Sequence, residues 1–370
     1  MHDALALLER VPSVLGFLLA LTIVAECCSA TGVFDVLAHR LVRAGRGRTA
    51  VTWSLFLLVT AGVTCLLSLD TTAVLMTSAA VVVARQLRAP VAMFAFPTLW
   101  LANMGSLWLP VSNLTNLLAR DHLPGTGALG FVRLSWPVAL TTTLVPLMCA
   151  AIIWRCSFRA GPDGSEHHDG RSTSAASCDD EPSYRERAAR RSVAVITAVM
   201  CAGILVVEPW VAAGVAALCC AATLAVLAPD RLRDISLPWR SLAITASLFV
   251  AVAALHGSGA LHPLTRGLEH APAWALTIGA AGLANGMNNL PAYLALEPAA
   301  SEDATRMLAL LIGVNAASGL TWWGSMATLL WRERLRREGI TVTWRRHLAL
   351  TGSTTLVTTA ATLTVLALTR

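Results

Sequence analysis

Five long runs of uncharged, mostly apolar residues constrain the fold of this chain more than any other feature. They cover residues 11–25, 50–69, 134–154, 210–228 and 348–369. Each is close to the length of about 20 residues with which an α-helix crosses the hydrocarbon layer of a membrane. Only 14% of the residues are charged, against about 25% in a soluble domain. The sequence therefore predicts an all-α polytopic membrane protein with about 10–11 transmembrane segments, some of half length.

The basic residues are all arginine, and they cluster in the short segments between the apolar runs. The chain holds 28 of them and has a net charge of +6. The clusters are Arg40/Arg43/Arg46/Arg48, Arg85/Arg88, Arg231/Arg233/Arg240 and Arg332/Arg334/Arg336/Arg337/Arg345/Arg346. Basic loops beside membrane segments lie on the cytoplasmic side, which predicts a multi-pass protein of the cell membrane with the lipid bilayer as its surroundings. We expect no nucleic-acid partner, because the arginines form no continuous basic face.

A polar segment divides the chain into two membrane halves. Residues 155–191 contain many Gly, Ser and charged residues, a composition typical of disordered segments. We therefore predict a first membrane repeat over residues 1–154, a cytoplasmic disordered linker over 155–191 and a second membrane repeat over 192–370.

Similar polar motifs interrupt an apolar stretch in each half, at residues 103–118 and 315–330. A gap-free superposition pairs Asn103 with Asn315, Ser106 with Ser318, Leu117 with Leu329 and Arg120 with Arg332. Interrupted hydrophobic segments at corresponding positions of two halves indicate the binding site of a transporter. The sequence thus favours a carrier for a small solute. It contains no nucleophile–base pair or metal-ligand set that would indicate an enzyme.

Asp70 is an acidic residue inside an otherwise apolar region. A charged side chain at membrane depth costs about 3 kcal/mol on insertion scales, so such residues are rare and usually functional. We interpret Asp70 as a residue that holds a coupling ion, either H⁺ or Na⁺, and we expect no other cofactor. The alternative is that Asp70 caps a helix that begins at Thr71. The two roles are compatible.

Hydroxyl and amide side chains surround the predicted helix breaks near Pro110, Pro291 and Gly324. Free N–H groups at a helix restart suit an oxyanion or a polyol, and freed carbonyl groups suit Na⁺ or a hydroxylated solute. The alternative is that these side chains only join helices within lipid. The candidate substrate- and ion-binding residues are Asp70, Thr71, Thr72, Asn103, Ser112, Asn113, Thr115, Asn116, Asn288, Asn289, Asn315, Ser325 and Thr328. No residue is expected to hold a resident metal.

Four motifs carry a family resemblance, at residues 68–75, 102–118, 287–291 and 324–330. They resemble motifs of the arsenite/antimonite permease family of the ion transporter superfamily, which also contains the divalent anion–sodium symporters. The resemblance covers roughly residues 12–154 and 192–331. It implies inverted repeats with two re-entrant hairpins and two unwound helices around a central site. It also implies a transport domain that moves against a scaffold in an elevator-like cycle, and a homodimer.

Three functions stay open on these grounds. The first is proton-coupled efflux of arsenite and antimonite, with Asp70 as the coupling acid and an ATPase subunit as a candidate partner. The second is Na⁺-coupled symport of a dicarboxylate, sulfate or a similar anion. Because no arginine lies within a core span and Asp70 would repel a dianion, we favour the first. The third is a degenerate, non-transporting paralogue, which we consider because the first apolar run resembles a later span of the family and the upstream helices are then expected to be missing.

Glu26 and two adjacent cysteine pairs lie in or beside apolar runs. We interpret Glu26 either as a second proton site or as a helix-end residue that reaches the interface. The pairs Cys27–Cys28 and Cys219–Cys220 have the soft sulfur ligands that trivalent arsenic prefers. Tight thiolate capture, however, suits a sensor better than a carrier that releases its cargo. We therefore interpret these cysteines as small buried hydrophobes.

Overall fold

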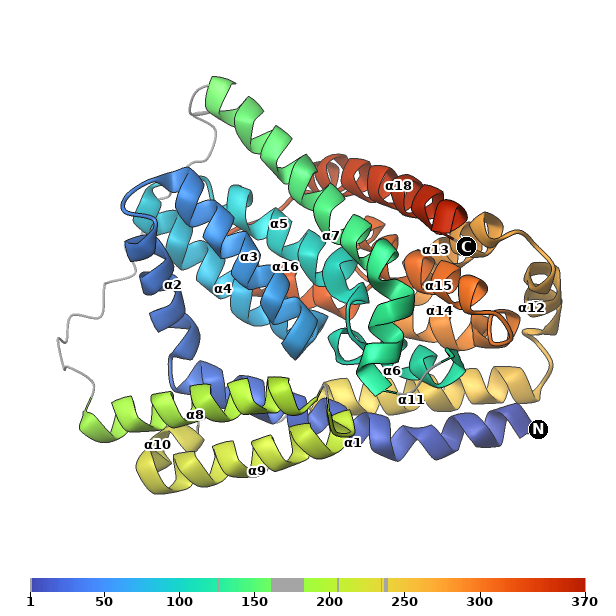
Figure 1. Cartoon of the computed structure of the whole chain (residues 1–370), viewed down its shortest axis with the longest axis horizontal. Helices are drawn as coiled ribbons and strands as arrows, with labels where there is room; N and C mark the ends of the chain where they lie inside the picture. The colour runs from blue at the N-terminus through green and yellow to red at the C-terminus, as the bar shows by residue number, and fades with distance from the viewer. Residues whose placement is uncertain are drawn as a thin grey trace.

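The computed structural model of the chain describes residues 2–124, 127–160, 183–204, 206–233, 235 and 239–369. Within these residues all regular structure is helical. Most helices run roughly along the long axis of the molecule and form three layers (Figure 1). The prediction of an all-α architecture is confirmed.

The first layer contains helices from both halves of the chain. They are α1 (His2–Ala30), α8 (Tyr184–Gly203), α9 (Pro209–Leu227) and α11 (Trp239–Gly257). Helix α1 packs against both α9 and α11, and α8 packs against α9. Helix α2 (Val33–Ala44) leaves α1 at a bend of 60°. Gly32 makes this bend with a φ of 70°, a left-handed conformation that glycine adopts without steric cost.

Two helical hairpins enter the middle layer from opposite ends of the molecule (Figure 1). The first consists of α3 (Thr49–Leu67) and α4 (Leu69–Leu87), which are joined by Ser68 and pack against each other. The second consists of α13 (Ala273–Met287) and α14 (Asn289–Leu296), which are joined by Asn288. Their tips meet in the middle, where backbone can be irregular at membrane depth because it is buried in protein or lines a cavity.

Two interrupted helices complete the middle layer, also in opposite directions (Figure 1). Helix α5 (Ala92–Met104) continues through two 3-10 turns, Gly105–Leu107 and Pro110–Ser112, into α6 (Leu114–Ala119). Helix α15 (Ala304–Leu311) continues through a π-helical turn, Ile312–Ala316, and a 3-10 turn, Ser318–Leu320, into α16 (Met326–Arg337). The described residues thus contain the two hairpins and two unwound helices that the family resemblance implied.

The third layer is formed by α7 (Gly127–Ala160) and α18 (Ser353–Thr369), which pack against each other. Helix α7 also covers α5. Three short helices lie between the longer ones: α10 (Pro229–Leu232), α12 (His262–Glu269) and α17 (Trp344–His347).

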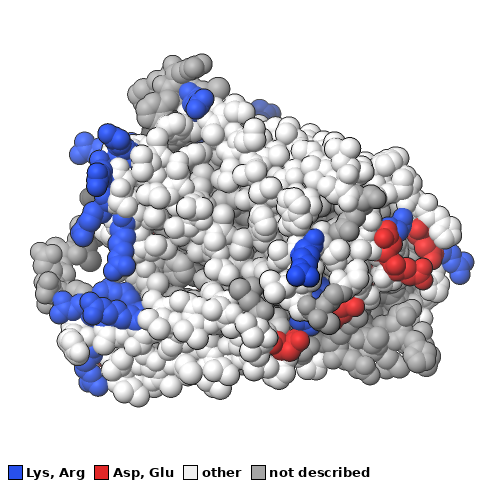
Figure 2. Space-filling model, in the orientation of Figure 1, with Lys and Arg blue, Asp and Glu red and all other residues white. Residues whose placement is uncertain are grey.

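Arginine side chains gather at one end of the molecule. In Figure 2 most of the arginine side chains in view line the left end, whereas the acidic side chains lie in the right half together with a few arginines. That left end contains α2, α10 and the open end of the first hairpin (Figure 1). The arginine loops that we predicted to share one side of the membrane therefore lie close together.

Four helices within the described residues are long and apolar enough to cross a membrane. They are Thr49–Leu67, Gly127–Arg155, Pro209–Leu227 and Trp344–Thr369, and the number rises to 6 if two bent helix pairs each count as one span. The predicted number of segments is higher because it also counts broken helices and hairpin arms, such as α14 with 8 residues, that are too short to cross a membrane alone.

Both ends of the predicted linker are helical. Helix α7 extends to Ala160, and α8 begins at Tyr184, so residues 155–160 and 184–191 correct the linker prediction. The start of α8 is fixed by a capping box, in which Ser183 Oγ accepts from the Glu186 N–H and the Ser183 N–H donates to the Glu186 carboxylate. The rest of the predicted linker, residues 161–182, lies outside the described residues.

Gly313 lies where the π-helical turn packs on α13. A Cβ atom here would stand 2.5 Å from Thr277 O and 2.7 Å from Ala280 Cβ. We expect Gly313→Ala to destabilise the protein by about 1–3 kcal/mol through overpacking, measured as a lower Tm of the purified protein in detergent. Gly282→Ala, also in the hairpin region but with no atom within 4 Å of the added Cβ, is the control. Equal Tm values for the two variants would contradict this packing.

Candidate functional site

The tips of the two hairpins share one backbone geometry. Ser68 has φ 90° and ψ 160°, and Asn288 has φ 95° and ψ 153°. Such positive φ values are uncommon for residues with a side chain. Ser68 Oγ accepts from the Thr71 N–H at 3.5 Å, and Asn288 Oδ1 accepts from the Leu290 N–H at 3.4 Å. Each tip residue therefore caps the helix that follows it.

The observed caps correct two details of the sequence interpretation. Helix α4 begins at Leu69 with Ser68 as its N-cap, so the interpretation of Asp70 as the cap is wrong. Asp70 lies in the first turn instead, where the helix dipole favours a negative charge. Pro291 lies in the first turn of α14, where its missing N–H removes no helical hydrogen bond. The second break is made at Asn288 and not at the proline.

The interrupted helices restart at corresponding residues of the two repeats. Asn113 and Ser325 are both extended, with φ −152° and ψ 141° at the first and φ −145° and ψ 152° at the second. Asn113 Oδ1 accepts from the Thr115 N–H at 3.2 Å, and Ser325 Oγ accepts from the Thr328 N–H at 3.1 Å. These two caps are paired by the same gap-free superposition that the sequence predicted.

The residues before the breaks match as well. Ser106 Oγ donates to Asn103 O at 2.8 Å, and Ser318 Oγ donates to Asn315 O at 3.0 Å. All four residues are buried. The internal repeat is thus visible in individual hydrogen bonds.

Reciprocal hydrogen bonds cross from each repeat to the other. Asn315 Nδ2 donates to Asn116 Oδ1 at 3.0 Å, and Asn103 Nδ2 donates to Thr328 Oγ1 at 3.3 Å. Asn116 and Thr328 occupy equivalent positions in the superposition. Each asparagine before one break therefore holds the helix that restarts after the other break.

The symmetry fails at the acceptor oxygens of these asparagines. Asn315 Oδ1 accepts from Asn113 Nδ2 and from Thr115 Oγ1, each at 2.8 Å. The counterpart of Thr115 is Ala327, which has no hydroxyl group. Within the described residues Asn103 Oδ1 is buried without a hydrogen-bond partner. Asn315 is therefore the more extensively bonded of the pair.

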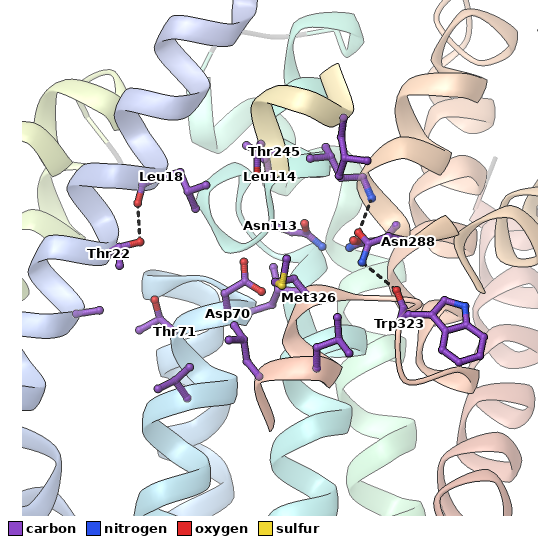
Figure 3. Close-up of a pocket in the computed structure, with 18 of the residues that line it drawn as sticks. Leu18, Thr22, Asp70, Thr71, Asn113, Leu114, Thr245, Asn288, Trp323 and Met326 are labelled. Carbon is purple, nitrogen blue, oxygen red and sulfur yellow. Dashed lines mark hydrogen bonds between the residues drawn. The ribbon is translucent and has the colours of Figure 1, made fainter. Parts of the chain in front are cut away.

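A cavity of about 480 Å³ lies between the first layer and the hairpin tips (Figure 3). Helices α1 and α11 form one wall, and the two tips and the starts of α6 and α16 form the other. Its polar lining residues are Thr22, Glu26, Asp70, Thr71, Asn113, Thr245, Asn288 and Asn289. Two of the described lining residues are acidic and none is basic.

Asp70 points from the start of α4 into this space, near Asn113 and Met326 (Figure 3). Its Oδ1 atom is buried, and no donor among the described residues reaches it. On the other side of the cavity, Asn288 Nδ2 donates to Trp323 O at 3.0 Å. This bond ties the second hairpin tip to the second helix break.

The predicted site residues form two groups. Asp70, Thr71, Asn113, Asn288 and Asn289 line the cavity. The others are buried behind it: Thr72, Asn103, Ser112, Thr115, Asn116, Asn315, Ser325 and Thr328. Several of this second group hold backbone, as when Thr72 Oγ1 donates to Ser68 O at 2.8 Å and Ser112 Oγ donates to Cys65 O at 2.7 Å. Their positions suit side chains that support the helix breaks.

The sequence motifs did not predict that helices of the first layer form one wall of the cavity. Thr22 on α1 and Thr245 on α11 line the cavity, but no break or repeat marks these long apolar helices. The available indication was Glu26, an acid within an apolar run. Glu26 does line the cavity, as one of the two interpretations of this residue required.

The unequal bonding of the two asparagines leads to a prediction. Asn315→Ala removes the partner of Asn113, Thr115 and Asn116, and a buried polar group without a partner costs about 1–3 kcal/mol. We expect Asn315→Ala to lower the Tm of the purified protein more than its symmetry mate Asn103→Ala does. An equal or larger loss for Asn103→Ala would contradict the observed network.

The chain is similar in sequence to known membrane transport proteins. The family model described as a citrate transporter matches residues 9–316 of this chain. The arsenical pump membrane protein of Escherichia coli is 24% identical over 353 residues, which are 88% of this chain and 79% of the relative. Proteins of the same name from E. coli strain K12 and Shigella flexneri are 23% identical over 350 residues. The resemblance to arsenical permeases is confirmed, and the chain belongs to the citrate transporter family of membrane transporters.

Proposed function

We propose that this secondary transporter exports As(OH)₃ and Sb(OH)₃ in exchange for protons across the cell membrane. The relatives named arsenical pump membrane proteins suggest the substrate. The cavity between the first layer and the hairpin tips is the proposed binding site. The observation that carries the proposal is the charge of its lining, which includes Glu26 and Asp70 but no basic side chain among the described residues.

This lining suits a neutral solute better than an anion. A dianion entering the cavity would face the carboxyl groups of Glu26 and Asp70 and no basic side chain among the described lining residues, and like charges at short range repel strongly. As(OH)₃ is small and uncharged, and its hydroxyl groups both donate and accept hydrogen bonds. Thr71, Asn113, Asn288 and Asn289 offer hydroxyl and amide partners around the cavity.

Asp70 is the proposed coupling acid. Its buried Oδ1 atom has no donor among the described residues, and an ionised carboxylate away from water is costly unless paired. The N-terminus of α4 acts in the other direction, because its dipole stabilises a negative charge. A carboxyl group balanced between these effects can take up a proton on one side of the membrane and release it on the other.

The proposed cycle moves the hairpins and broken helices against the first layer. The cavity lies at the boundary between these two parts, so a displacement of one relative to the other carries the site across the membrane. We include a homodimer in this proposal, as the family resemblance implies. A soluble ATPase subunit is the alternative energy source for the same membrane path.

The second candidate is Na⁺-coupled symport of a carboxylate. The description of the matching family model as a citrate transporter favours it. Asparagine oxygens at the second tip are ligands that suit Na⁺, and bound cations would offset the acidic lining. The two candidates differ in substrate and coupling ion, so one transport assay separates them.

The test of the proposed function is arsenite uptake into everted membrane vesicles. With the vesicle interior acidified, we expect wild-type protein to accumulate arsenite several-fold over the medium. Asp70→Asn cannot carry a proton and should lower accumulation to the level of vesicles without the protein. Asp35→Asn, an exposed aspartate of α2, is the matched control and should accumulate arsenite like wild type.

The opposite outcomes are equally informative. Arsenite accumulation that survives Asp70→Asn would remove Asp70 from the coupling mechanism. Citrate or succinate uptake driven by a Na⁺ gradient, with no arsenite accumulation under either gradient, would establish the second candidate instead. No transport of any of these solutes would leave the non-transporting paralogue as the explanation.

A further inference from the structure

Four arginines in the segment from α2 to α3 carry charges that no acidic side chain offsets. They are Arg40 and Arg43 on α2 and Arg46 and Arg48 in the loop that follows, and all four are exposed. None of their side chains forms a hydrogen bond or an ion pair with another described residue. These four residues are called the α2–α3 patch below. Helix α2 lies at the end of the molecule where arginine side chains gather (Figures 1 and 2).

Other arginines of the chain are compensated within the protein. Arg85 Nη1 lies 3.0 Å from Glu338 Oε2, and Arg231 Nη2 lies 3.2 Å from Glu186 Oε1. A group of positive charges without such partners produces a local potential that attracts anions. The α2–α3 patch is therefore a part of the basic end that is open to an anionic partner.

The loop that presents the patch is held in place by its own backbone and by α3. The Gly45 N–H donates to Leu41 O, and the Arg48 N–H donates to Gly45 O, each at 2.9 Å. A Cβ atom at Gly45 would overlap with the side chain of Thr52, so the loop packs directly on the start of α3. The buried side of α2 packs against α3 and α4. The arginines thus project from a packed part of the fold.

An exposed apolar side of α3 continues from the patch. Helix α3 is long and apolar enough to cross a membrane, and Arg48 is its N-cap. Val51 and Leu58 on this helix are 40% and 71% exposed, and their spacing places them two turns apart on the same side. Exposed apolar side chains on a membrane-crossing helix contact lipid acyl chains. The patch therefore lies at the level of the headgroups of the lipids that cover α3.

We propose that the α2–α3 patch binds an anionic phospholipid, with the headgroup phosphate on the arginines and the acyl chains along α3. Guanidinium groups form bidentate, charge-assisted hydrogen bonds with phosphate oxygens. Basic clusters directly beside a membrane segment attract anionic lipids. An acidic protein surface would match the charge of the patch, but it would not match the apolar side of α3 that continues from it.

The bound lipid would act on the connection between two parts of the molecule. Helix α2 follows α1 of the first layer through the bend at Gly32, and it packs against the first hairpin. A headgroup held by α2 and the following loop therefore fixes this connection at the membrane surface. The site does not depend on which solute the protein transports, so it stands apart from the proposed function.

The experiment measures the Tm of the purified full-length chain in detergent with added phosphatidylglycerol or phosphatidylcholine, which differ in headgroup charge. Because a ligand that binds the folded state stabilises it, we expect phosphatidylglycerol to raise the Tm by about 3 °C more than phosphatidylcholine does. The variant Arg43→Gln/Arg46→Gln/Arg48→Gln should lose most of this difference. About 0.5 M NaCl should also reduce it, because salt screens exposed charges.

The matched control is Arg231→Gln/Arg336→Gln/Arg337→Gln. It removes the same charge as the patch variant, but from arginines that are ion-paired with glutamates. The control should keep the Tm difference between the two lipids. An equal loss in the control and the patch variant would overturn the site, because net charge alone would then explain the effect. A patch variant that keeps the full difference of the parent would also overturn it.

Two other occupants of the patch would give different results. If inorganic phosphate raised the Tm of the parent as much as phosphatidylglycerol does, the ligand would be a free anion. The other candidate is the segment 161–182, which holds more acidic than basic residues and lies outside the described part of the chain. Phosphatidylglycerol would then give no advantage in the parent, and the patch variant would have the lower Tm in phosphatidylcholine. Either result would overturn the lipid site.

Discussion

Backbone N–H and C=O groups that a helix break exposes at membrane depth must find partners within the protein, because lipid offers none. The part of the chain that the structure describes contains such interruptions at two hairpin tips and in two unwound helices. Polar side chains at the restarts satisfy part of that need: Ser68, Asn113, Asn288 and Ser325 each cap the following helix. The cavity exists where these interruptions converge, so its polar lining and its support have the same physical origin.

The crossing asparagine bonds make the two repeats mutually dependent. Asn315 holds the start of α6, and Asn103 holds the start of α16. Neither interrupted helix is therefore complete without the other half of the chain. The first layer differs, because its helices are uninterrupted and pack mainly through apolar side chains. This contrast is consistent with one part that carries the site and another that forms a fixed wall.

Much of the architecture could be predicted from the sequence because the membrane helices and the helix breaks each depend on residues that are close together in the chain. Apolar runs identified the membrane class, and repeated polar motifs located the breaks. The choice of cap at the first tip was wrong because Ser68 and Asp70 are both good capping residues, and only the backbone conformation separates them. The start of α8 was missed because the Ser183–Glu186 capping box lies in a charged segment. Contacts between distant residues, such as those that form the first-layer wall of the cavity, have no local sequence pattern.

The reciprocal bonds Asn315–Asn116 and Asn103–Thr328 also bear on how such a chain can diverge. In a symmetric dimer of two identical half-length chains, the same asparagine of each chain would make both bonds. Every substitution at that position would then alter both bonds at once. When the two halves are encoded in one chain, as they would be after gene duplication and fusion, a substitution in one half leaves the other half unchanged. Ala327 stands where the first half has Thr115. Asn315 Oδ1 therefore accepts from the Thr115 hydroxyl group, whereas no donor among the described residues reaches Asn103 Oδ1. The two halves are thus free to diverge in how firmly each of them holds the helix break of the other.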